Sequence, residues 1–407
     1  MAQPRHLTAK QATEALGISA ATLYAYVSRG LIRSEAIEGD GRARTYNAED
    51  VQRLRDRKAQ RKNPGEAVRA ALHWGMPVLE SGLALIAEGG LYYRGYDALE
   101  LARTRSVEEV AALLWSGDLD GGDRLFASAT AHESVWSAPG DMPPIPRMQI
   151  ALALAGAGDL GAYDLRPEMM ALTGARILRL MAAAAAGNQA GMNGTAHTLA
   201  EGWGIPDETS VRLLNAALIL CADHELNISS FAARVAASGE APLYAVVAAG
   251  LAALQGAKHG GLTRRAEALL REMDGPAQAD RAISDRLRRG EIVPGFGHPL
   301  YPDGDPRARL LLALIEEAMP GSPVVGMVGA ISARMMDAVQ LHPTIDLGLA
   351  ALACALGLPA DAAICLFAVG RTIGWVGHAI EQVEQGRMIR PRASYVGPPI
   401  RRTDSDE

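Results

Sequence analysis

The sequence is poor in aromatic residues and in cysteine. Phe, Trp and Tyr make up 5% of the 407 residues while 49% of the chain is hydrophobic, so its core has to be aliphatic. Alanine and leucine enter a helix at little cost, which favours a mainly helical fold. The three cysteines, Cys221, Cys354 and Cys365, have no metal-ligand spacing, and an odd, sparse set is typical of a reducing compartment.

Long apolar runs are also missing. The N-terminus lacks the apolar core of a signal peptide, and the apolar run 347–360 ends before the roughly 18–20 residues that a membrane span needs. These absences argue against a secreted or membrane-spanning protein. We therefore expect a soluble cytoplasmic protein with no membrane partner.

Charge is distributed unevenly along the chain. Residues 1–65 contain 12 Lys and Arg against 7 Asp and Glu and so carry +5, which leaves −11 for the remainder because the formal net charge is −6. A basic head on an acidic body indicates two parts with different partners.

The basic head has the pattern of a winged helix-turn-helix. LTAKQATEALG predicts a helix ended by Gly17, and ISAATLYAYVSRGLI predicts a second helix that Ser19 caps. The sequence 39–41, Gly-Asp-Gly, is a hairpin turn signal, and Asn47 precedes a charged helix. This order resembles the MerR-type family. The resemblance implies DNA contacts from Thr22, Tyr24, Tyr26, Arg42 and Arg44, although small helix-turn-helix domains also dock proteins.

The remaining chain alternates apolar helical patterns with Gly/Pro turns. We expect helices near 105–117, 146–157, 173–187, 207–222, 242–257, 262–273, 308–318, 323–337, 346–356 and 360–385. Strand patterns are scarce, apart from a possible hairpin near 84–96. The predicted fold class is mainly α.

Four segments place a polar group beside glycine or within apolar surroundings. They are 222–227 with His224, 258–261 with His259, 293–298 with His298, and 344–346 with Asp346. A lone histidine is more often a surface or ordinary core residue, and we assign that role to His6, His73, His132, His197, His342 and His378. The candidate histidines form no HxxxH pair, so we expect no metal site.

In their order, these segments resemble the citrate synthase family over about 80–398. The resemblance rests on GGLYYRGYDALELA at 89–102, SVEEVAALLWSGDL at 106–119, ADHELNISSFAARVAAS at 222–238, and the later blocks AKHGG, IVPGFGH, DPRA, TIDLGLAAL, GRTIGWVGHAIEQ and IRPRASYVGP. It implies large and small helical domains. We expect the winged domain at 1–62, a linker at 63–75, the large domain at 76–260 and 361–407, and the small domain at 261–360.

The resemblance also implies roles for the site residues. Asp346 would be the base that deprotonates an acyl thioester, His259 would donate to the thioester oxygen, and His298 would polarise the ketone of a 2-oxo acid. His224, Arg307, Arg371 and Arg390 would bind oxaloacetate, with Arg390 reaching the neighbouring subunit of a homodimer. No permanent cofactor is implied, because acetyl-CoA is a cosubstrate.

The segment expected to bind coenzyme A departs from the family pattern. Val293, Pro294, Gly295, Phe296 and Gly297 would line the thioester, and their glycines allow close backbone approach. The residues that follow His298 are Pro-Leu-Tyr-Pro-Asp, where family members often carry basic residues. Three activities remain open: citrate synthase, 2-methylcitrate synthase using propionyl-CoA, and a DNA-binding regulator with a metabolite-sensing body.

Overall fold

The computed structural model describes residues 6–36, 44–48, 50–52, 54, 79–129, 142–187 and 194–400. The chain divides into two compact units, 1–80 and 81–407. The predicted linker, 63–75, and the predicted 39–41 turn lie outside the described residues. The finer division of the body at 260 and 360 stays a prediction.

The N-terminal unit contains a helix-turn-helix and a small sheet. Its elements are β1 (His6–Thr8), α1 (Ala9–Leu16), α2 (Ala20–Ser28), β2 (Ser34–Ala36) and β3 (Arg44–Asn47), and β3 pairs antiparallel with both other strands. Gly17 ends α1 with φ 56°, and the Ser19 hydroxyl accepts the N–H of Thr22 at the start of α2. The predicted helices and caps are therefore confirmed, while β1 was not expected.

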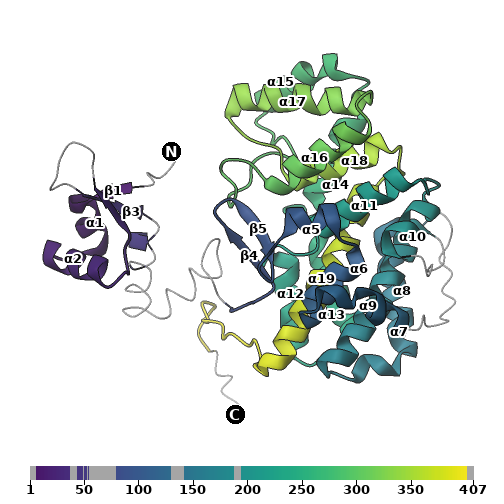
Figure 1. Cartoon of the computed structure of the whole chain (residues 1–407), viewed down its shortest axis with the longest axis horizontal. Helices are drawn as coiled ribbons and strands as arrows, with labels where there is room; N and C mark the ends of the chain where they lie inside the picture. Colours follow the sequence, from purple (N-terminus) through teal and green to yellow (C-terminus); the bar gives the residue numbers. More distant parts are fainter. Residues whose placement is uncertain are drawn as a thin grey trace, which may run out of the picture. The chain divides into compact units, whose positions relative to one another are not determined.

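The second unit is mainly helical (Figure 1). Its strands are β4 (Ala84–Ala87), β5 (Gly90–Tyr93) and β6 (Tyr96–Asp97). Its α-helices are α5 (Ala98–Thr104), α6 (Val107–Ser116), α7 (Gly122–Ser128), α8 (Pro144–Gly158), α9 (Pro167–Ala186), α10 (Thr195–Gly202), α11 (Glu208–Leu220), α12 (Ile228–Ser238), α13 (Leu243–Leu254), α14 (Gly261–Arg271), α15 (Ala279–Arg288), α16 (Pro306–Ala318), α17 (Pro323–Val339), α18 (Ile345–Ala355) and α19 (Ala362–Gln385). Three short 3-10 turns are η1 (Leu119–Gly121), η2 (Leu160–Tyr163) and η3 (Pro276–Gln278).

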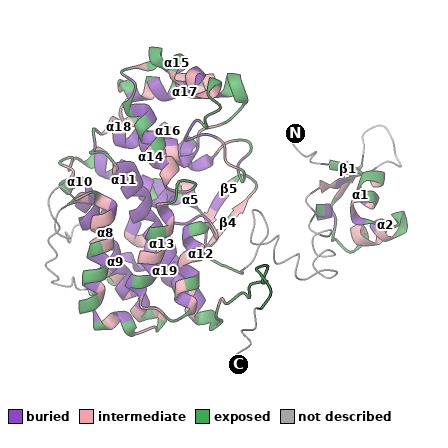
Figure 2. Cartoon of the chain, turned by 180° about the vertical axis from the view of Figure 1, so that it is seen from behind, coloured by how far each residue is buried: buried purple, intermediate pink, exposed green. Residues whose placement is uncertain are grey.

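Helix α19 is the centre of this unit. Every residue from Ala362 to Ile380 is buried, and the helix packs on α9, α11, α12 and α13 (Figure 2). Both α19 and α9 are long and apolar enough to cross a membrane by length and composition, but they lie largely inside the unit and are core helices. Glycines let neighbouring backbone approach α19, since a Cβ on Gly370 would lie 2.5 Å from Leu218 O.

The ten helices expected from apolar spacing are all present, with ends shifted by up to six residues, the largest shift being at the start of α9. The hairpin near 84–96 is also confirmed, because β4 and β5 pair antiparallel. The sequence does not predict α5, α7, α10, α12 and α15. Helices α5, α7 and α10 have seven or eight residues and α15 is highly charged, so their periodic signal is weak, whereas α12 is as long as the predicted α14.

Candidate active site

Two loops distant in sequence pair beside the start of α18. Gly297 N–H donates to His342 O and Thr344 N–H donates to Gly295 O, each at 2.9 Å. Gly295 has φ 85°, and a Cβ there would lie 2.9 Å from the Cβ of Leu347, so this close approach requires glycine. The pairing brings the segment that carries His298 next to the segment that carries Asp346.

Asp346 lies in the first turn of α18 between two hydroxyl groups. Thr263 Oγ1, from α14, donates to Oδ1 at 2.5 Å, and Thr344 Oγ1 donates to Oδ2 at 3.2 Å. Burial raises the pKa of Asp346, and the hydrogen bond from Thr263 only partly opposes this. A carboxylate with a raised pKa is better matched to proton abstraction near neutral pH.

His259 is a neutral histidine held on one side by a serine. Its Nε2 lies 2.9 Å from the hydroxyl of Ser229, which in turn lies 2.8 Å from Asn227 Oδ1 at the cap of α12. Its ring meets the Phe367 ring edge to face at 5.7 Å. Burial lowers the pKa of His259 to about 4, helped by the charge of Arg371, so the imidazole is uncharged at neutral pH.

His298 belongs to a cluster of three rings with His224 and Tyr301. The ring centroids lie 5.1 to 5.5 Å apart, and His224 Nε2 and the Tyr301 hydroxyl are 3.1 Å apart. Burial lowers the pKa of His298 to about 4 and moves that of His224 well below its usual value. Leu300 N–H donates to His298 Nδ1 at 3.2 Å, so neutral His298 carries its proton on Nε2.

Two buried arginines face this cluster from α16 and α19. Arg307 pairs with Asp305 through two hydrogen bonds of 3.0 and 2.8 Å. Arg371 donates to Cys221 O at 2.8 Å and lies 4.9 Å over the Phe367 ring. The arrangement combines a carboxylate and neutral imidazoles, which suit proton abstraction from a weak carbon acid, with two cations, which suit the binding of a second substrate that carries carboxylates.

Comparisons with known proteins agree with this chemistry. Residues 71–392 match the model described as citrate synthase, C-terminal domain. The chain belongs to the citrate synthase family. The citrate synthase of Haloferax volcanii is 33% identical over 357 residues, covering 79% of this chain and 94% of the relative. The 2-methylcitrate synthase of Shewanella oneidensis is 29% identical, covering 77% and 90%.

A solved citrate synthase has the same fold. The enzyme of the archaeon Thermoplasma acidophilum, in a ternary complex with carboxymethyl coenzyme A and oxaloacetate, superposes with a TM-score of 0.70 at 25% identity, covering 80% of this chain and 95% of that one. Membership of the family makes the chain an acyltransferase, one of the enzymes that convert the transferred acyl group into an alkyl group. Members of the family hold no permanent cofactor, since coenzyme A compounds are their substrates.

The structure does not bring every predicted residue to the site. Arg390 is exposed on the segment after α19, and within the described residues no hydrogen bond or ion pair joins it to the other site residues. Val293 and Phe296 are buried in the core, so only the backbone of 293–297 can approach a thioester. These positions leave both predicted roles untested.

Several residues around the site were missed by sequence reasoning. Ser229, Thr263, Asp305 and Tyr301 contact the predicted site residues directly, as described above. Asp305 had a readable signal, because an acidic residue before Pro306 is a typical helix cap. The other three occur in ordinary helical or loop contexts, and only the fold brings them to the site.

The N-terminal unit has its own family match. Residues 7–65 match the model of MerR HTH family regulatory proteins. Tyr24 is exposed on α2, and Arg44 is exposed on β3. Tyr26 instead packs partly against the small core, and Arg42 lies outside the described residues. Thr22 is half-buried, with its hydroxyl 3.0 Å from that of Ser19.

Proposed function

We propose that this chain condenses acetyl-CoA with oxaloacetate and hydrolyses the resulting thioester to citrate and coenzyme A. The observation that supports this most directly is the pairing of the loop before His298 with the loop before Asp346, together with the hydrogen bond from Thr263, just after His259, to the Asp346 carboxylate. Both histidines are neutral, and two buried arginines lie in the same unit. A base alone cannot deprotonate so weak a carbon acid. A positioned donor has to stabilise the enolate oxygen at the same time.

In the first step Asp346 removes a proton from the methyl group of acetyl-CoA. His259 donates a hydrogen bond to the thioester oxygen, where negative charge develops. The Ser229 hydroxyl has a single proton and two neighbouring acceptors, Asn227 Oδ1 and His259 Nε2. When Ser229 donates to Nε2, the proton of His259 lies on Nδ1 and is available to the thioester.

In the second step the enol carbon attacks the ketone carbon of oxaloacetate. His298 Nε2–H donates to the ketone oxygen, and the alkoxide that forms with the carbon–carbon bond takes this proton. His298 regains a proton from solvent, and Asp346 releases the proton that it removed from the methyl group, so the protons balance. Arg307, Arg371 and His224 form the substrate clamp, which holds the carboxylates of oxaloacetate. Water then cleaves the thioester, releasing citrate and the thiol of coenzyme A.

The test is coenzyme A release from acetyl-CoA with oxaloacetate, measured with a thiol reagent. Wild type should turn over, and Asp346→Asn should lower kcat by a factor on the order of 100 to 10,000, the usual contribution of a general base. Thr263→Val is the matched control, because it removes a hydrogen bond to Asp346 and keeps the carboxylate. Absence of thiol release by wild type would exclude the proposed activity.

Propionyl-CoA is the alternative thioester. One extra methylene is worth only about 1–3 kcal/mol of discrimination, so the same machinery serves both substrates. The 2-methylcitrate synthase of Shewanella oneidensis is nearly as similar to this chain as the citrate synthase of Haloferax volcanii. The ratio of kcat/KM for the two thioesters decides between the two activities.

We further propose a cytoplasmic homodimer in which Arg390 completes the site of the partner subunit. Ile150 and Leu154 of α8 and Leu160 and Tyr163 of η2 expose apolar surface on one stretch of the chain, which supports a covered face. The experiment mixes Arg390→Ala with Asp346→Ala. A mixed dimer would contain one complete site, so activity should return only on mixing. A monomer in sedimentation would contradict the proposal.

DNA is the partner that we propose for the N-terminal unit, on the basis of its MerR match and of exposed Tyr24 and Arg44. In gel shifts of the full chain, Tyr24→Ala should relax sequence preference, while Arg44→Ala should weaken binding and reduce its salt dependence. Binding that neither salt nor Arg44→Ala changes would favour a protein-docking role.

A further inference from the structure

A fully buried acid and histidine lie behind the substrate clamp. His378 Nε2 is 3.2 Å from Asp223 Oδ1, and both side chains have no exposed surface. Within the described part of the chain, neither carboxylate oxygen of Asp223 and neither ring nitrogen of His378 forms a well-aligned hydrogen bond. Buried polar groups are almost always satisfied, so a pair left with only each other needs an explanation.

The pair lies on one face of α19. Arg371, Gly374 and His378 follow one another at intervals of three and four residues and therefore share that face. Gly374 lets the 222–223 segment approach the helix, because a Cβ there would be 2.4 Å from Ala222 O and 2.6 Å from Asp223 Oδ1. The Asp223 carboxylate thus lies against the helix between Arg371 and His378.

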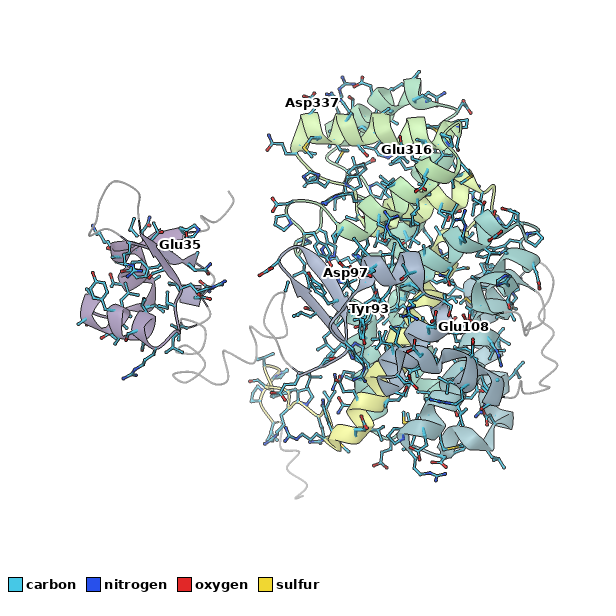
Figure 3. All side chains as sticks on the ribbon, in the orientation of Figure 1. Glu35, Tyr93, Asp97, Glu108, Glu316 and Asp337 are labelled. Atoms are coloured by element: carbon cyan, nitrogen blue, oxygen red, sulfur yellow. The ribbon has the colours of Figure 1, made fainter. Side chains whose placement is uncertain are left out.

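These contacts dock the 221–224 segment along two turns of α19. Arg371 Nε donates to Cys221 O at 2.8 Å at one end, and His378 meets the Asp223 side chain at the other. Tyr93 of β5 is labelled in Figure 3. Its phenol holds the Asp223 backbone, with its oxygen 3.1 Å from Asp223 O. The next residue is His224, so the docking of this segment fixes the spacing between His224 and Arg371.

We propose that His378 is a positioning residue for the substrate clamp: by pairing with the buried Asp223 carboxylate, it fixes the 221–224 segment on α19 and thereby the spacing of His224 and Arg371. This inference rests on the proposed binding of oxaloacetate by these two residues. His378 itself contacts no substrate. Its sequence context alone indicates an ordinary core histidine, and the pairing becomes visible only in the fold.

Removal of His378 leaves the buried Asp223 carboxylate without its partner. Removing one member of a buried pair lowers the free energy of unfolding more than replacing both members. The segment then has to shift to bring Asp223 toward other partners or water, and His224 moves with it. The loss should therefore appear in oxaloacetate binding, while acetyl-CoA binding is spared. A glutamine at position 378 still presents an N–H group to the carboxylate, so it should restore the spacing.

The experiment compares His378→Leu with His378→Gln in the full chain. Calorimetry gives the Kd of oxaloacetate, and steady-state kinetics give KM for each substrate. For His378→Leu we expect the Kd and KM of oxaloacetate to rise at least tenfold, with the KM of acetyl-CoA within twofold of wild type. For His378→Gln we expect the Kd of oxaloacetate within about threefold of wild type.

Should His378→Leu fail to fold, the double variant Asp223→Asn with His378→Leu removes the buried charge together with its partner. It should fold and still bind oxaloacetate at least tenfold more weakly than wild type, because the contact that docks the segment is gone. The inference would be overturned if either leucine variant bound oxaloacetate as tightly as wild type. It would also be overturned if the KM values of oxaloacetate and acetyl-CoA rose equally. Failure of wild type to bind oxaloacetate would instead overturn the proposed function.

Discussion

The two buried arginines of the substrate clamp are stabilised in opposite ways. Arg307 has a direct carboxylate partner, Asp305, which outweighs the cost of burial and raises the pKa of the guanidinium. Arg371 is just as buried, yet it contacts a backbone carbonyl and an aromatic face, and burial lowers its pKa. The charge that most opposes this lowering is that of Asp223, which acts on Arg371 without a hydrogen bond.

This difference separates a clamp arginine that also stabilises the fold, Arg307, from one that serves mainly the ligand, Arg371. The guanidinium of Arg307 already donates two hydrogen bonds to Asp305. Asp305 also caps α16 and accepts a hydrogen bond from Ile345 N–H at 2.9 Å. Arg307 therefore holds two elements together even without substrate. Arg371 donates its Nε–H to Cys221 O, so its terminal nitrogens are the part suited to an incoming carboxylate.

The largest effect that we predict is on folding. Arg307→Leu leaves Asp305 buried without its cation, so the free energy of unfolding should fall by about 3–5 kcal/mol. Urea denaturation of the ligand-free protein measures this change. Adding Asp305→Asn keeps the cap of α16 and removes the orphan charge, so the double variant should recover much of the loss. A loss below about 1 kcal/mol in the single variant would contradict the structural role.

Arg371→Leu should show the reverse pattern. It removes a buried cation that has no direct carboxylate partner, so the free energy of unfolding should change by no more than about 1 kcal/mol. The Kd of oxaloacetate should rise by about 100-fold, since a charged contact to a carboxylate is lost. Calorimetry on the same preparation measures both quantities. Equal destabilisation by the two leucine variants would remove the distinction between the arginines.

The same two residues mark what sequence can predict. Asp305 and Arg307 are two positions apart at the start of one helix, so a short motif contains the whole pair. The partners of Arg371 come from 221–223, about 150 positions earlier, and from one face of a helix whose apolar pattern gives no hint of them. The helices of the body followed from apolar spacing because that spacing is local. Ser229, Thr263 and His378 depend on packing between elements distant in sequence.

Acid should destabilise the protein in two stages. His259 and His298 have folded pKa values of about 4, below the usual 6.5, so the unfolded chain binds more protons between pH 6.5 and 4, and stability falls as pH drops through that window. Asp305 has a lowered pKa, so its contribution is present above its usual value of 3.8 and is lost only at lower pH. Urea midpoints from pH 7 to 3 measure both stages. His259→Gln should reduce the first stage, to which His298 still contributes, and leave the second unchanged.

The smallest effect that we predict concerns Tyr301, which contacts both His224 and Arg307 of the substrate clamp. The Tyr301 hydroxyl reaches His224 Nε2 at 3.1 Å, while its ring lies 5.6 Å from the guanidinium carbon of Arg307. Tyr301→Phe removes the hydrogen bond and keeps the ring, so it should cost about 1 kcal/mol and raise the KM of oxaloacetate about fivefold. The lost hydrogen bond joins Tyr301, whose ring contacts Arg307, to His224, whose segment contacts Arg371. Combining Tyr301→Phe with His378→Leu should therefore weaken oxaloacetate binding by more than the sum of the two single changes in binding free energy. Strict additivity would mean that Tyr301 and His378 act on oxaloacetate binding independently.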